Sequence, residues 1–469
     1  MTTVILAEKP SQARSYMEGL KIKHTAKQHK ASGTTFLDEH TVIVAAAGHL
    51  LELCEPEHYN ERFKDRDNID DLPIIPEHFD YMLRADVKSL YVEIKKELAE
   101  ADVIIIATDK DNEGGAIAYN ILRFSRNLHG KRILRAYPTA LNKEAVVRQF
   151  KTLDPIDKTW KDANAAIARA RSDWMIGMNL SRLYTAKLKN VGIIGNYAVG
   201  RSISTTLNLI CQWELERQNF KEEAIFELDG EIKINDEVVT LKSPIREVGK
   251  GSKTKFIKKL QTSGITKKQV IGTVVFIDSK IKQVYPSIMF TKGNLYKEMA
   301  RVAGWSQEKS KEIMQINYEM GYQTYPRTDA GEIPRYQYEY LKNNFDKYMN
   351  AIGEFGNYVK FQMTEDKLKR YLTKENSDDA HYGIVPTEKL MTAMDQVTDD
   401  QRLMYEVVVR KAMTLLLKPY TYTANRLGID INGIPMIAQN NVVTDRGWKG
   451  ILLPTKSRIK RKMQTEKVM

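Results

Sequence analysis

Short apolar runs alternate with helical patterns over the first 150 residues. The runs at 4–7, 41–47, 103–107 and 133–137 are bounded by polar or turn-forming residues and predict β-strands. Strands that alternate with helices build a parallel sheet covered by helices. We therefore expect residues 1–150 to form an α/β domain.

Along the rest of the chain, the spacing of the apolar residues changes twice. Ala, Leu, Arg and Met recur at helical spacing over 153–213, whereas apolar and polar residues alternate over 224–284 and again over 420–431. The two β-rich stretches bracket a helical middle, so we expect the chain to leave and return through one β domain. The expected divisions are a helical domain at 151–213 with 452–469, a β-rich arch at 214–285 and 395–451, and a helical domain at 286–394.

Composition narrows the possible functions. The chain has 469 residues, enough for about three domains. Its 72 Lys and Arg exceed its 60 Asp and Glu by 12, which favours a polyanionic partner. Two cysteines argue against a zinc cluster or a disulfide framework, and no apolar run approaches the roughly 20 residues of a membrane span. Because the first residues also lack a signal-peptide pattern, we expect a cytoplasmic protein.

A lysine-rich stretch lies inside the β-rich region. No acidic residue occurs between Val248 and Ile277, while seven lysines fall at 250–268. The stretch is interpreted either as a solvated loop or as a phosphate contact. The basic tail at 456–463 has the same two interpretations.

Acidic residues follow two of the predicted strands. Asp109 and Asp111 come directly after the apolar run 103–107, and residues two apart in extended backbone share a face. Glu113 follows at the start of a predicted helix, and Glu8 ends the first strand. Carboxylates gathered at one sheet edge suit Mg²⁺, for which Mn²⁺ can substitute. The alternative is that the helix macrodipole alone favours acids there.

Tyr325 is the candidate nucleophile. A helical pattern ends at Gly321, and Pro326 cannot continue a strand, which places Tyr325 on a loop. A tyrosine hydroxyl attacks at neutral pH only when a cation stabilises the developing charge, and Arg327 is two residues away. The alternative is an ordinary surface turn. Spacing alone likewise leaves His381 open between a catalytic and a structural role.

Several motifs together resemble the type IA DNA topoisomerases, nearest to the topoisomerase III branch. They occur in the family's order and span roughly residues 3–450: AEKPSQA, AGHLLEL, ATDKDNEGG, RARSDWMIGMNLSR, VGRSISTTL, MGYQTYPRTD and AHYGIVPTE. The resemblance implies a multidomain α/β fold. A Toprim domain with a Rossmann-like parallel sheet is joined in this fold to helical and β-rich domains that form a ring.

The resemblance also implies an activity and its residues. An enzyme of this family, an isomerase, cuts one DNA strand through a 5′-phosphotyrosyl intermediate, passes another strand and reseals the first without ATP. The implied catalytic residues are Tyr325, Arg327, Glu8, Lys9 and His381. The implied metal ligands are Glu8, Asp109, Asp111 and Glu113, and the implied DNA-binding residues are Arg169, Asp173 and Arg201.

The implied substrates are single-stranded DNA and negatively supercoiled DNA, which melts readily. Because its substrate is DNA, we expect the enzyme to work at the nucleoid. Relaxation and decatenation both stay open as the main task. The sequence contains no G-x-x-x-x-G-K-[ST] nucleotide-binding loop, in agreement with a reaction that needs no ATP.

The chain departs from the family pattern at several places, among them the acidic motif and the C-terminus. Asn112 and Gly115 stand where the acidic motif usually has an arginine and a further acid, and the chain stops at Met469, whereas family members continue well beyond Trp448. We expect a reduced ring base, a truncation, or a second polypeptide that completes the ring, and we favour the last two.

Three other classes of protein remain possible: a Toprim-type nuclease or primase, an RNA strand-passage enzyme, and a catalytically inactive DNA-binding subunit.

Overall fold

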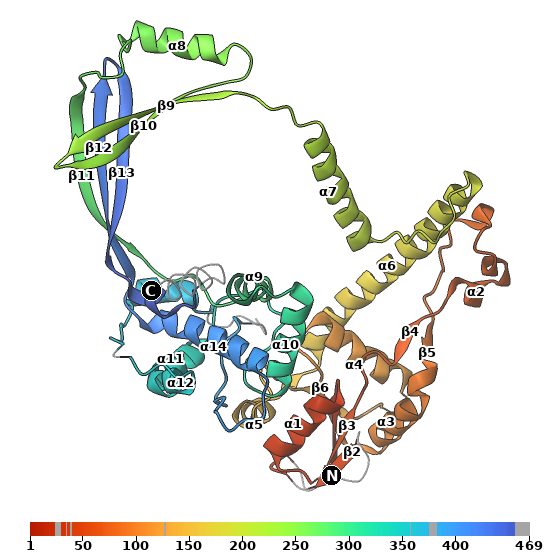
Figure 1. The fold of residues 1–469 in the computed structure, drawn as a ribbon. Helices are drawn as coiled ribbons and strands as arrows, with labels where there is room; N and C mark the ends of the chain where they lie inside the picture. Colours follow the sequence, from red (N-terminus) through yellow and green to blue (C-terminus); the bar gives the residue numbers. More distant parts are fainter. Residues whose placement is uncertain are drawn as a thin grey trace.

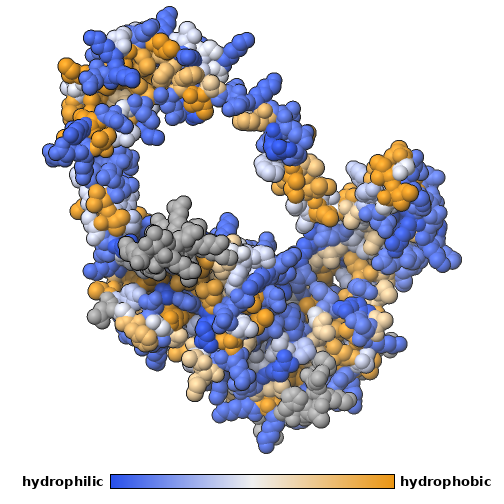
Figure 2. Space-filling model, viewed as in Figure 1, coloured by the Kyte–Doolittle hydropathy of each residue, from blue (hydrophilic) through white to orange (hydrophobic). Residues whose placement is uncertain are grey.

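The computed structural model describes residues 1–23, 30–33, 35–37, 40–125, 128–356, 358–374 and 382–454. Its ribbon forms a broad lower body and an arch that rises from one side of the body and returns toward the other (Figure 1). The space-filling view shows an open hole between the arch and the body (Figure 2). The fold thus has the ring shape that the sequence analysis expects.

The lower body contains a six-stranded sheet in the order β2-β3-β1-β6-β7-β8. Strands β3, β1, β6 and β7 pair in parallel, and β2 and β8 are antiparallel at the edges. The predictions of strands at 4–7, 41–47, 103–107 and 133–137 are confirmed, with small differences at their ends. The strands are β1 Thr2–Ala7, β2 Lys30–Gly33, β3 His40–Ala45, β6 Val103–Ala107, β7 Arg132–Arg135 and β8 Asp154–Pro155.

Helices cover both faces of this sheet, because its central strands are apolar on both faces. One face packs on α1 and α5 through Tyr16 and Phe150, and the other on α3 and α4 through Ile94 and Ile121. We call this unit the α/β part. It also holds a small hairpin, β4 Leu51–Leu53 with β5 Tyr81–Leu83, and the helices α1 Pro10–Leu20, α2 Pro56–Tyr59, α3 Lys88–Glu100, α4 Asn112–Phe124 and α5 Lys143–Lys151.

Two long helices lead from the α/β part to the arch, as the helical spacing over 153–213 predicts. They are α6 Asp157–Asn190 and α7 Arg201–Gln218. Helix α6 packs closely on α4 at Gly115, where an added Cβ would lie 3.1 Å from the backbone nitrogen of Ala163. Gly115 therefore permits the close approach of these two helices.

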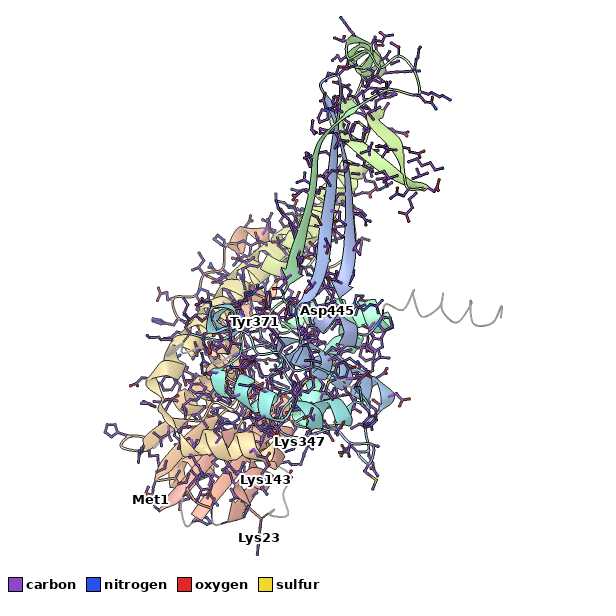
Figure 3. The ribbon with its side chains drawn as sticks, turned by 90° about the vertical axis from the view of Figure 1, so that its left-hand side faces the viewer. Met1, Lys23, Lys143, Lys347, Tyr371 and Asp445 are labelled. Carbon is purple, nitrogen blue, oxygen red and sulfur yellow. The ribbon has the colours of Figure 1, made fainter. Side chains whose placement is uncertain are left out.

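The arch is a five-stranded antiparallel sheet in the order β11-β12-β13-β10-β9. Strand β11 leads into the helical middle and β12 returns from it, and the two pair along their length from Thr273 with Asp430 to Val284 with Tyr420. Asp445, at the end of β13, lies where the sheet meets the lower body (Figure 3). The strands are β9 Ile225–Ile234, β10 Glu237–Val248, β11 Thr273–Val284, β12 Tyr420–Ile431 and β13 Ile434–Asp445.

The segment between β11 and β12 forms a helical part of the lower body around a tyrosine-rich core that includes Tyr322, Tyr348 and Tyr405. Helix α14 packs here against α10 and α12. Only 420–445 of the expected arch segment 395–451 is therefore in the sheet; the divisions otherwise stay predictions. The helices are α9 Lys292–Ala303, α10 Gln307–Glu319, α11 Arg335–Asn343, α12 Phe345–Ala351, α13 Glu365–Leu368 and α14 Asp399–Met413.

Short 3₁₀ turns complete the described chain: η1 Glu61–Lys64, η2 Ile69–Asp71, η3 Ala85–Val87, η4 Lys369–Tyr371, η5 Thr414–Leu416 and η6 Gly447–Ile451. The interpretation of the lysine-rich stretch as a loop is wrong for its first half, which is helix α8 Ser252–Thr262. The basic tail at 456–463 lies outside the described residues. Among the described helices, none combines the length and apolar character needed to cross a bilayer.

Candidate active site between the α/β part and the helical part

Tyr325 stands where the helical part meets the α/β part. Helix α10 is followed by Gly321 in the left-handed region, with φ of 77°, and the chain then runs along the α/β part. The backbone nitrogen of Tyr325 donates to the carbonyl of Thr139 at 2.9 Å. Its hydroxyl donates to Oδ2 of Asp111 at 2.7 Å, a contact between residues 214 positions apart. The fold thus brings the candidate nucleophile onto the acidic motif.

Asp111 serves two structural purposes at this contact. Its Oδ1 accepts the backbone N–H of Gly114 at 2.7 Å and so caps α4, while its Oδ2 faces Tyr325. Nη1 of Arg327 also lies 3.4 Å from Oδ2. Burial and the negative charges of Asp109 and Asp111 raise the pKa of Tyr325 well above its usual value, so the hydroxyl keeps its proton in this state.

Glu8 and Asp109 meet at the carboxyl edge of the sheet, as their positions after β1 and β6 predict. Oε2 of Glu8 accepts the backbone N–H of Asp109 at 3.1 Å, and both carboxyl groups are buried. Nζ of Lys9 lies 3.5 Å from Glu8 and 3.8 Å from Asp109. The side-chain amide of Gln12 donates to Asp109. Gln12 was not among the predicted site residues, although its place in the first turn after Glu8 could have indicated it.

Asp109 carries an unusual proton affinity. Burial, together with the neighbouring carboxylates of Glu8 and Asp111, raises its pKa to about 7, although Lys9 and Arg327 oppose the shift. The two cations therefore do not offset the negative charge of the cluster fully. A bound cation would favour the ionised form of Asp109.

This pKa makes a prediction for the variant Asp109→Asn in the absence of divalent ions. The pKa of Asp109 is higher in the native state than in the unfolded chain. Between about pH 4 and 7 the native state therefore binds a proton that the unfolded chain has lost, and the free energy of unfolding falls as the pH rises through this range. Above about pH 7, the ionised Asp109 lowers the free energy of unfolding by at most about 4 kcal/mol. We expect Asp109→Asn to raise the free energy of unfolding by about 2–3 kcal/mol more at pH 8 than at pH 5. Urea unfolding in EDTA measures this difference, and equal changes at both pH values would contradict it.

The donor set fits a hard divalent cation. Glu8, Asp109 and Asp111 offer carboxylate oxygens at one edge, and the raised pKa of Asp109 reflects charge that a cation would offset. Within the described residues, however, no three acidic, histidine or cysteine side chains already surround a common point at ligand distance. Glu8, Asp109 and Asp111 are thus the residues that would hold Mg²⁺.

The fourth predicted acid is engaged elsewhere. Glu113 forms an ion pair with Arg169 of α6, and its second oxygen lies 2.9 Å from Nε2 of His49. Burial lowers the pKa of His49. The sequence analysis named Glu113 as a metal ligand and Arg169 as a DNA-binding residue, but it did not identify this pair or His49. The AGHLLEL motif, which contains His49, was the available signal.

Two other predicted residues form a pair that joins the middle of α6 to the first residue of α7. Nε of Arg201 lies 2.5 Å from Oδ1 of Asp173, and Nη2 lies 2.9 Å from Oδ2. Both side chains are about half exposed. This pair is separate from the contacts around Tyr325. His381, also predicted in the site, lies outside the described residues.

Arg135 is a buried support that the sequence analysis missed. It is only 1% exposed, and its guanidinium donates to the carbonyls of Ile106, Thr108 and Asp109 at 2.8–3.2 Å. The Asp109 carbonyl is also approached by Gly114, where an added Cβ would lie only 2.2 Å away. Arg135 and Gly114 therefore fix the backbone turn that carries Asp109. A single arginine at the end of an apolar strand gave no clear signal.

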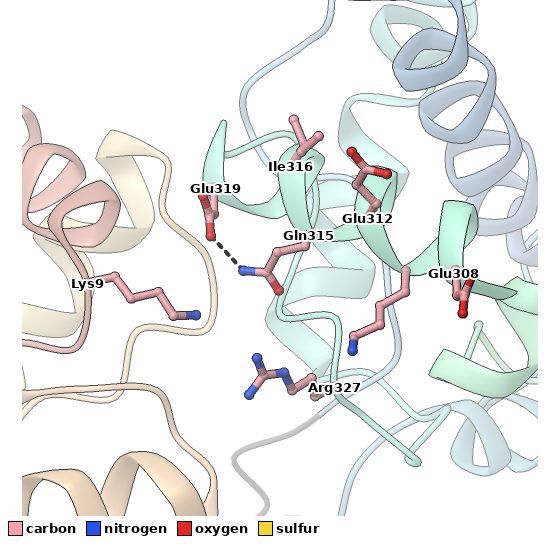
Figure 4. Close-up of a pocket in the computed structure, with 8 residues that line it drawn as sticks. Lys9, Glu308, Glu312, Gln315, Ile316, Glu319 and Arg327 are labelled. Carbon is pink, nitrogen blue, oxygen red and sulfur yellow. Dashed lines mark hydrogen bonds between the residues drawn. The ribbon is translucent and has the colours of Figure 1, made fainter. Parts of the chain in front are cut away.

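An open cleft of about 540 Å³ lies beside the site. Lys9 of the α/β part and Arg327 of the helical part point into it from different sides. The remaining wall is a face of α10 that carries both signs of charge: Glu308, Lys311, Glu312 and Glu319 (Figure 4). The side chain of Gln315 donates to Glu319 at 2.8 Å along this wall. The cleft thus presents two cations next to Tyr325, an arrangement that suits a phosphate group.

Comparisons with known proteins agree with this geometry. A model of the Toprim domain matches residues 3–141, and a model described as DNA topoisomerase matches residues 157–468. DNA topoisomerase 3 of Haemophilus influenzae is 27% identical over 474 residues, which cover 96% of this chain and 70% of that protein. DNA topoisomerase 3 of Staphylococcus aureus strain USA300 is also 27% identical, and the match covers 96% of this chain but 60% of that protein.

A solved structure shares the fold. Full-length topoisomerase I from Thermotoga maritima superposes with a TM-score of 0.65 at 21% identity, over 96% of this chain and 67% of that one. The two family models together account for nearly the whole chain. The chain therefore belongs to the type IA DNA topoisomerase family, as its motifs indicate.

Proposed function

We propose that this chain is an ATP-independent topoisomerase that cuts and reseals one DNA strand through Tyr325. The observation that carries the proposal is the contact between the Tyr325 hydroxyl and Asp111, 2.7 Å long and made between two separate parts of the fold. A surface tyrosine in an ordinary turn would not be buried beside a cluster of acids and two cations. Tyr325 is 5% exposed.

The proposed cleavage exchanges one phosphodiester for another, so that one bond to phosphorus forms as one breaks. The Tyr325 oxygen attacks the phosphorus, the bond from phosphorus to the 3′ oxygen breaks, and the 5′ phosphate becomes joined to tyrosine. Asp111 accepts a hydrogen bond from the hydroxyl and is placed to receive its proton. Glu8 would supply a proton to the leaving 3′ oxygen. Because the new ester replaces the old one, resealing is the reverse reaction and needs no ATP.

Charge stabilisation comes from the two sides of the cleft. Arg327 and Lys9 would hold the phosphate oxygens as negative charge develops on them, and each already lies near an active-site carboxylate. Mg²⁺, or Mn²⁺ in its place, would add positive charge at Glu8, Asp109 and Asp111. His381 would act near the same phosphate, and Glu113 stays a proposed ligand only if its pair with Arg169 opens.

Single-stranded DNA is the proposed substrate of this cleft. Arg169, Asp173 and Arg201 would line its path toward α6 and α7. Negatively supercoiled DNA would be favoured because it melts readily. Relaxation and decatenation are both compatible with the open ring (Figure 2).

The direct test is a covalent adduct. Purified chain is mixed with single-stranded DNA labelled at its 3′ end, with and without Mg²⁺, denatured and resolved by size. We expect the label to migrate with the protein in the presence of Mg²⁺, and label at the 5′ end of the same DNA to stay off the protein. Metal-dependent cleavage that leaves neither label on protein would favour the nuclease alternative. Competition with RNA of the same sequence tests the RNA alternative.

A second polypeptide remains part of the proposal. Helix α7 has no buried residue, and Ile203, Leu207, Ile210 and Trp213 are each more than half exposed. An isolated helix with so much apolar surface is expected to pack on another polypeptide. Cys211, also exposed on α7, offers a reporter, because its reaction with a maleimide should slow when a partner covers the helix.

A further inference from the structure

Glu388 joins the helical part to the α/β part. Its Oε1 accepts a hydrogen bond from Nη1 of Arg148 at 3.1 Å, and its Oε2 accepts one from the side-chain amide of Asn142 at 3.0 Å. Arg148 lies on α5, and Asn142 directly precedes this helix. The side chain of Glu388 is only 12% exposed. One largely buried carboxylate thus binds two side chains of the opposite part.

The surroundings hold both donors in place. The guanidinium of Arg148 lies 5.2 Å from the ring centroid of Tyr336, which belongs to α11 of the helical part. Asn142 is 4% exposed, and its amide also donates to Glu144 at 3.0 Å. An added Cβ at Gly321 would lie 3.1 Å from the backbone nitrogen of Asn142. The backbones of the two parts are therefore in close contact at this point.

Hydrogen bonds connect Glu388 to the segment that carries Tyr325. Thr387, the residue before Glu388, donates from its hydroxyl to the carbonyl of Gly321. The backbone nitrogen of Thr387 donates to the carbonyl of Tyr322 at 3.1 Å. Both acceptors lie within four residues of Tyr325. A force on Glu388 is thus transmitted to the chain that positions the nucleophile.

The proposed reaction removes one contact between the parts and leaves the contact at Glu388. The Tyr325 hydroxyl that donates to Asp111 becomes an ester oxygen in the adduct, and an ester oxygen has no proton to donate. The cut ends then lie on different parts, with the 5′ phosphate on Tyr325 and the 3′ oxygen beside Glu8. Another strand passes between the ends only after the parts separate.

We propose that Glu388 is a positioning residue that, through Arg148 and Asn142, holds the two cut ends together and so sets how often resealing precedes separation of the parts. This inference rests on the proposed function, because it assigns a role within the cleaved state. Glu388 itself touches none of the reacting atoms. It acts by keeping the part that carries Tyr325 against the part that carries Glu8.

Separation of the two parts is measured first without DNA. Lys96→Cys on α3 and Lys347→Cys on α12 place one dye on each part, at exposed positions on opposite sides of the lower body (Figure 1). Cys211→Ser removes the exposed native cysteine, and Cys54 is buried. Single-molecule energy transfer between the dyes falls when the parts separate. We expect Glu388→Gln to raise the rate of opening by about 5- to 30-fold, and an unchanged rate would overturn the proposal.

Two further variants distinguish this contact from a general loss of charge. Arg148→Met removes the partner on the α/β part and should speed opening to a similar extent. Its combination with Glu388→Gln should add little, because both changes break the same contact. Glu365→Gln is the matched control, since Glu365 pairs with Arg335 inside the helical part, and it should leave the opening rate unchanged. Additive effects in the double variant, or an equal effect of the control, would overturn the proposal.

The covalent adduct provides the functional measurement. With 3′-labelled single-stranded DNA and Mg²⁺, Glu388→Gln should form the adduct at the wild-type initial rate and accumulate more of it at steady state, because separated ends reseal slowly. A purely structural defect would lower the initial rate as well. A steady-state level at or below that of wild type would overturn the proposal. Failure of the wild-type chain to form any adduct would overturn the proposed function instead, and the opening rates measured without DNA would stand.

Discussion

The variant Tyr325→Phe is expected to form no covalent adduct with DNA under any metal condition. Phenylalanine keeps the ring and its edge contact with Tyr318, with centroids 5.4 Å apart, and removes only the oxygen that attacks phosphorus. Arg327 still lies near Asp111, so the acid keeps a partner. The loss should be complete, because a nucleophile has no partial replacement in the cleft. Gel resolution of 3′-labelled DNA after denaturation measures it.

The neighbouring tyrosine provides a matched control. Tyr318 is fully buried, and its hydroxyl has no hydrogen-bond partner in the part of the chain that the structure describes. Tyr318→Phe removes this oxygen at little cost and should keep adduct formation within a few fold of wild type. An adduct that persists in Tyr325→Phe and disappears in Tyr318→Phe would show that Tyr325 is not the nucleophile.

A second large effect is expected from Arg135→Met, this time on stability. The variant leaves the buried carbonyls of Ile106, Thr108 and Asp109 without the guanidinium that now donates to them. The carbonyl of Ile106 keeps the N–H of Ala136 as a donor, whereas those of Thr108 and Asp109 lose the guanidinium, and a buried polar group without its partner costs about 1–3 kcal/mol. We expect the free energy of unfolding to fall by about 3–5 kcal/mol. Urea unfolding, followed by the circular dichroism of the helices, measures the change.

Arg132→Met is the control on the same strand. Arg132 begins β7 with an exposed side chain, so the substitution removes an equal charge without opening a buried network. The expected change is within about 0.5 kcal/mol. If the two variants lose similar stability, the loss comes from the net charge of the sheet, and Arg135 has no special part in holding the turn at Asp109.

The local pattern of apolar and polar residues was sufficient to predict the sheet and much of the candidate site. Strands β1 and β6 are continuous apolar runs, and the polar residues that follow them, Glu8 and Asp109, must meet because parallel strands end at one edge. The loop position of Tyr325 followed from Gly321 and Pro326. These features depend on residues close together in sequence.

Contacts between elements that are distant in the chain could not be predicted from the sequence. The pair of Glu113 with Arg169 depends on how closely α6 packs on α4, and the proton affinity of Asp109 depends on burial. Helix α14 was assigned to the arch, but it packs against α10 and α12 of the helical part. In α8, the positions 252, 256 and 260 that face the arch lie four residues apart, but only the last two are apolar and lysines surround them, so the helical spacing was missed.

The pairing of Val284 with Tyr420 has a consequence for protein engineering. The chain that leaves the arch after β11 re-enters it at the directly opposite rung of the same ladder, so residues 285–419 form an insertion whose two ends are neighbours. Such a segment can be replaced by a tight hairpin turn, or expressed by itself with its ends close together. The arch without it would join β11, β12 and β13 as a three-stranded meander, with β10 and β9 beside β13, and Tyr325 would travel with the insert.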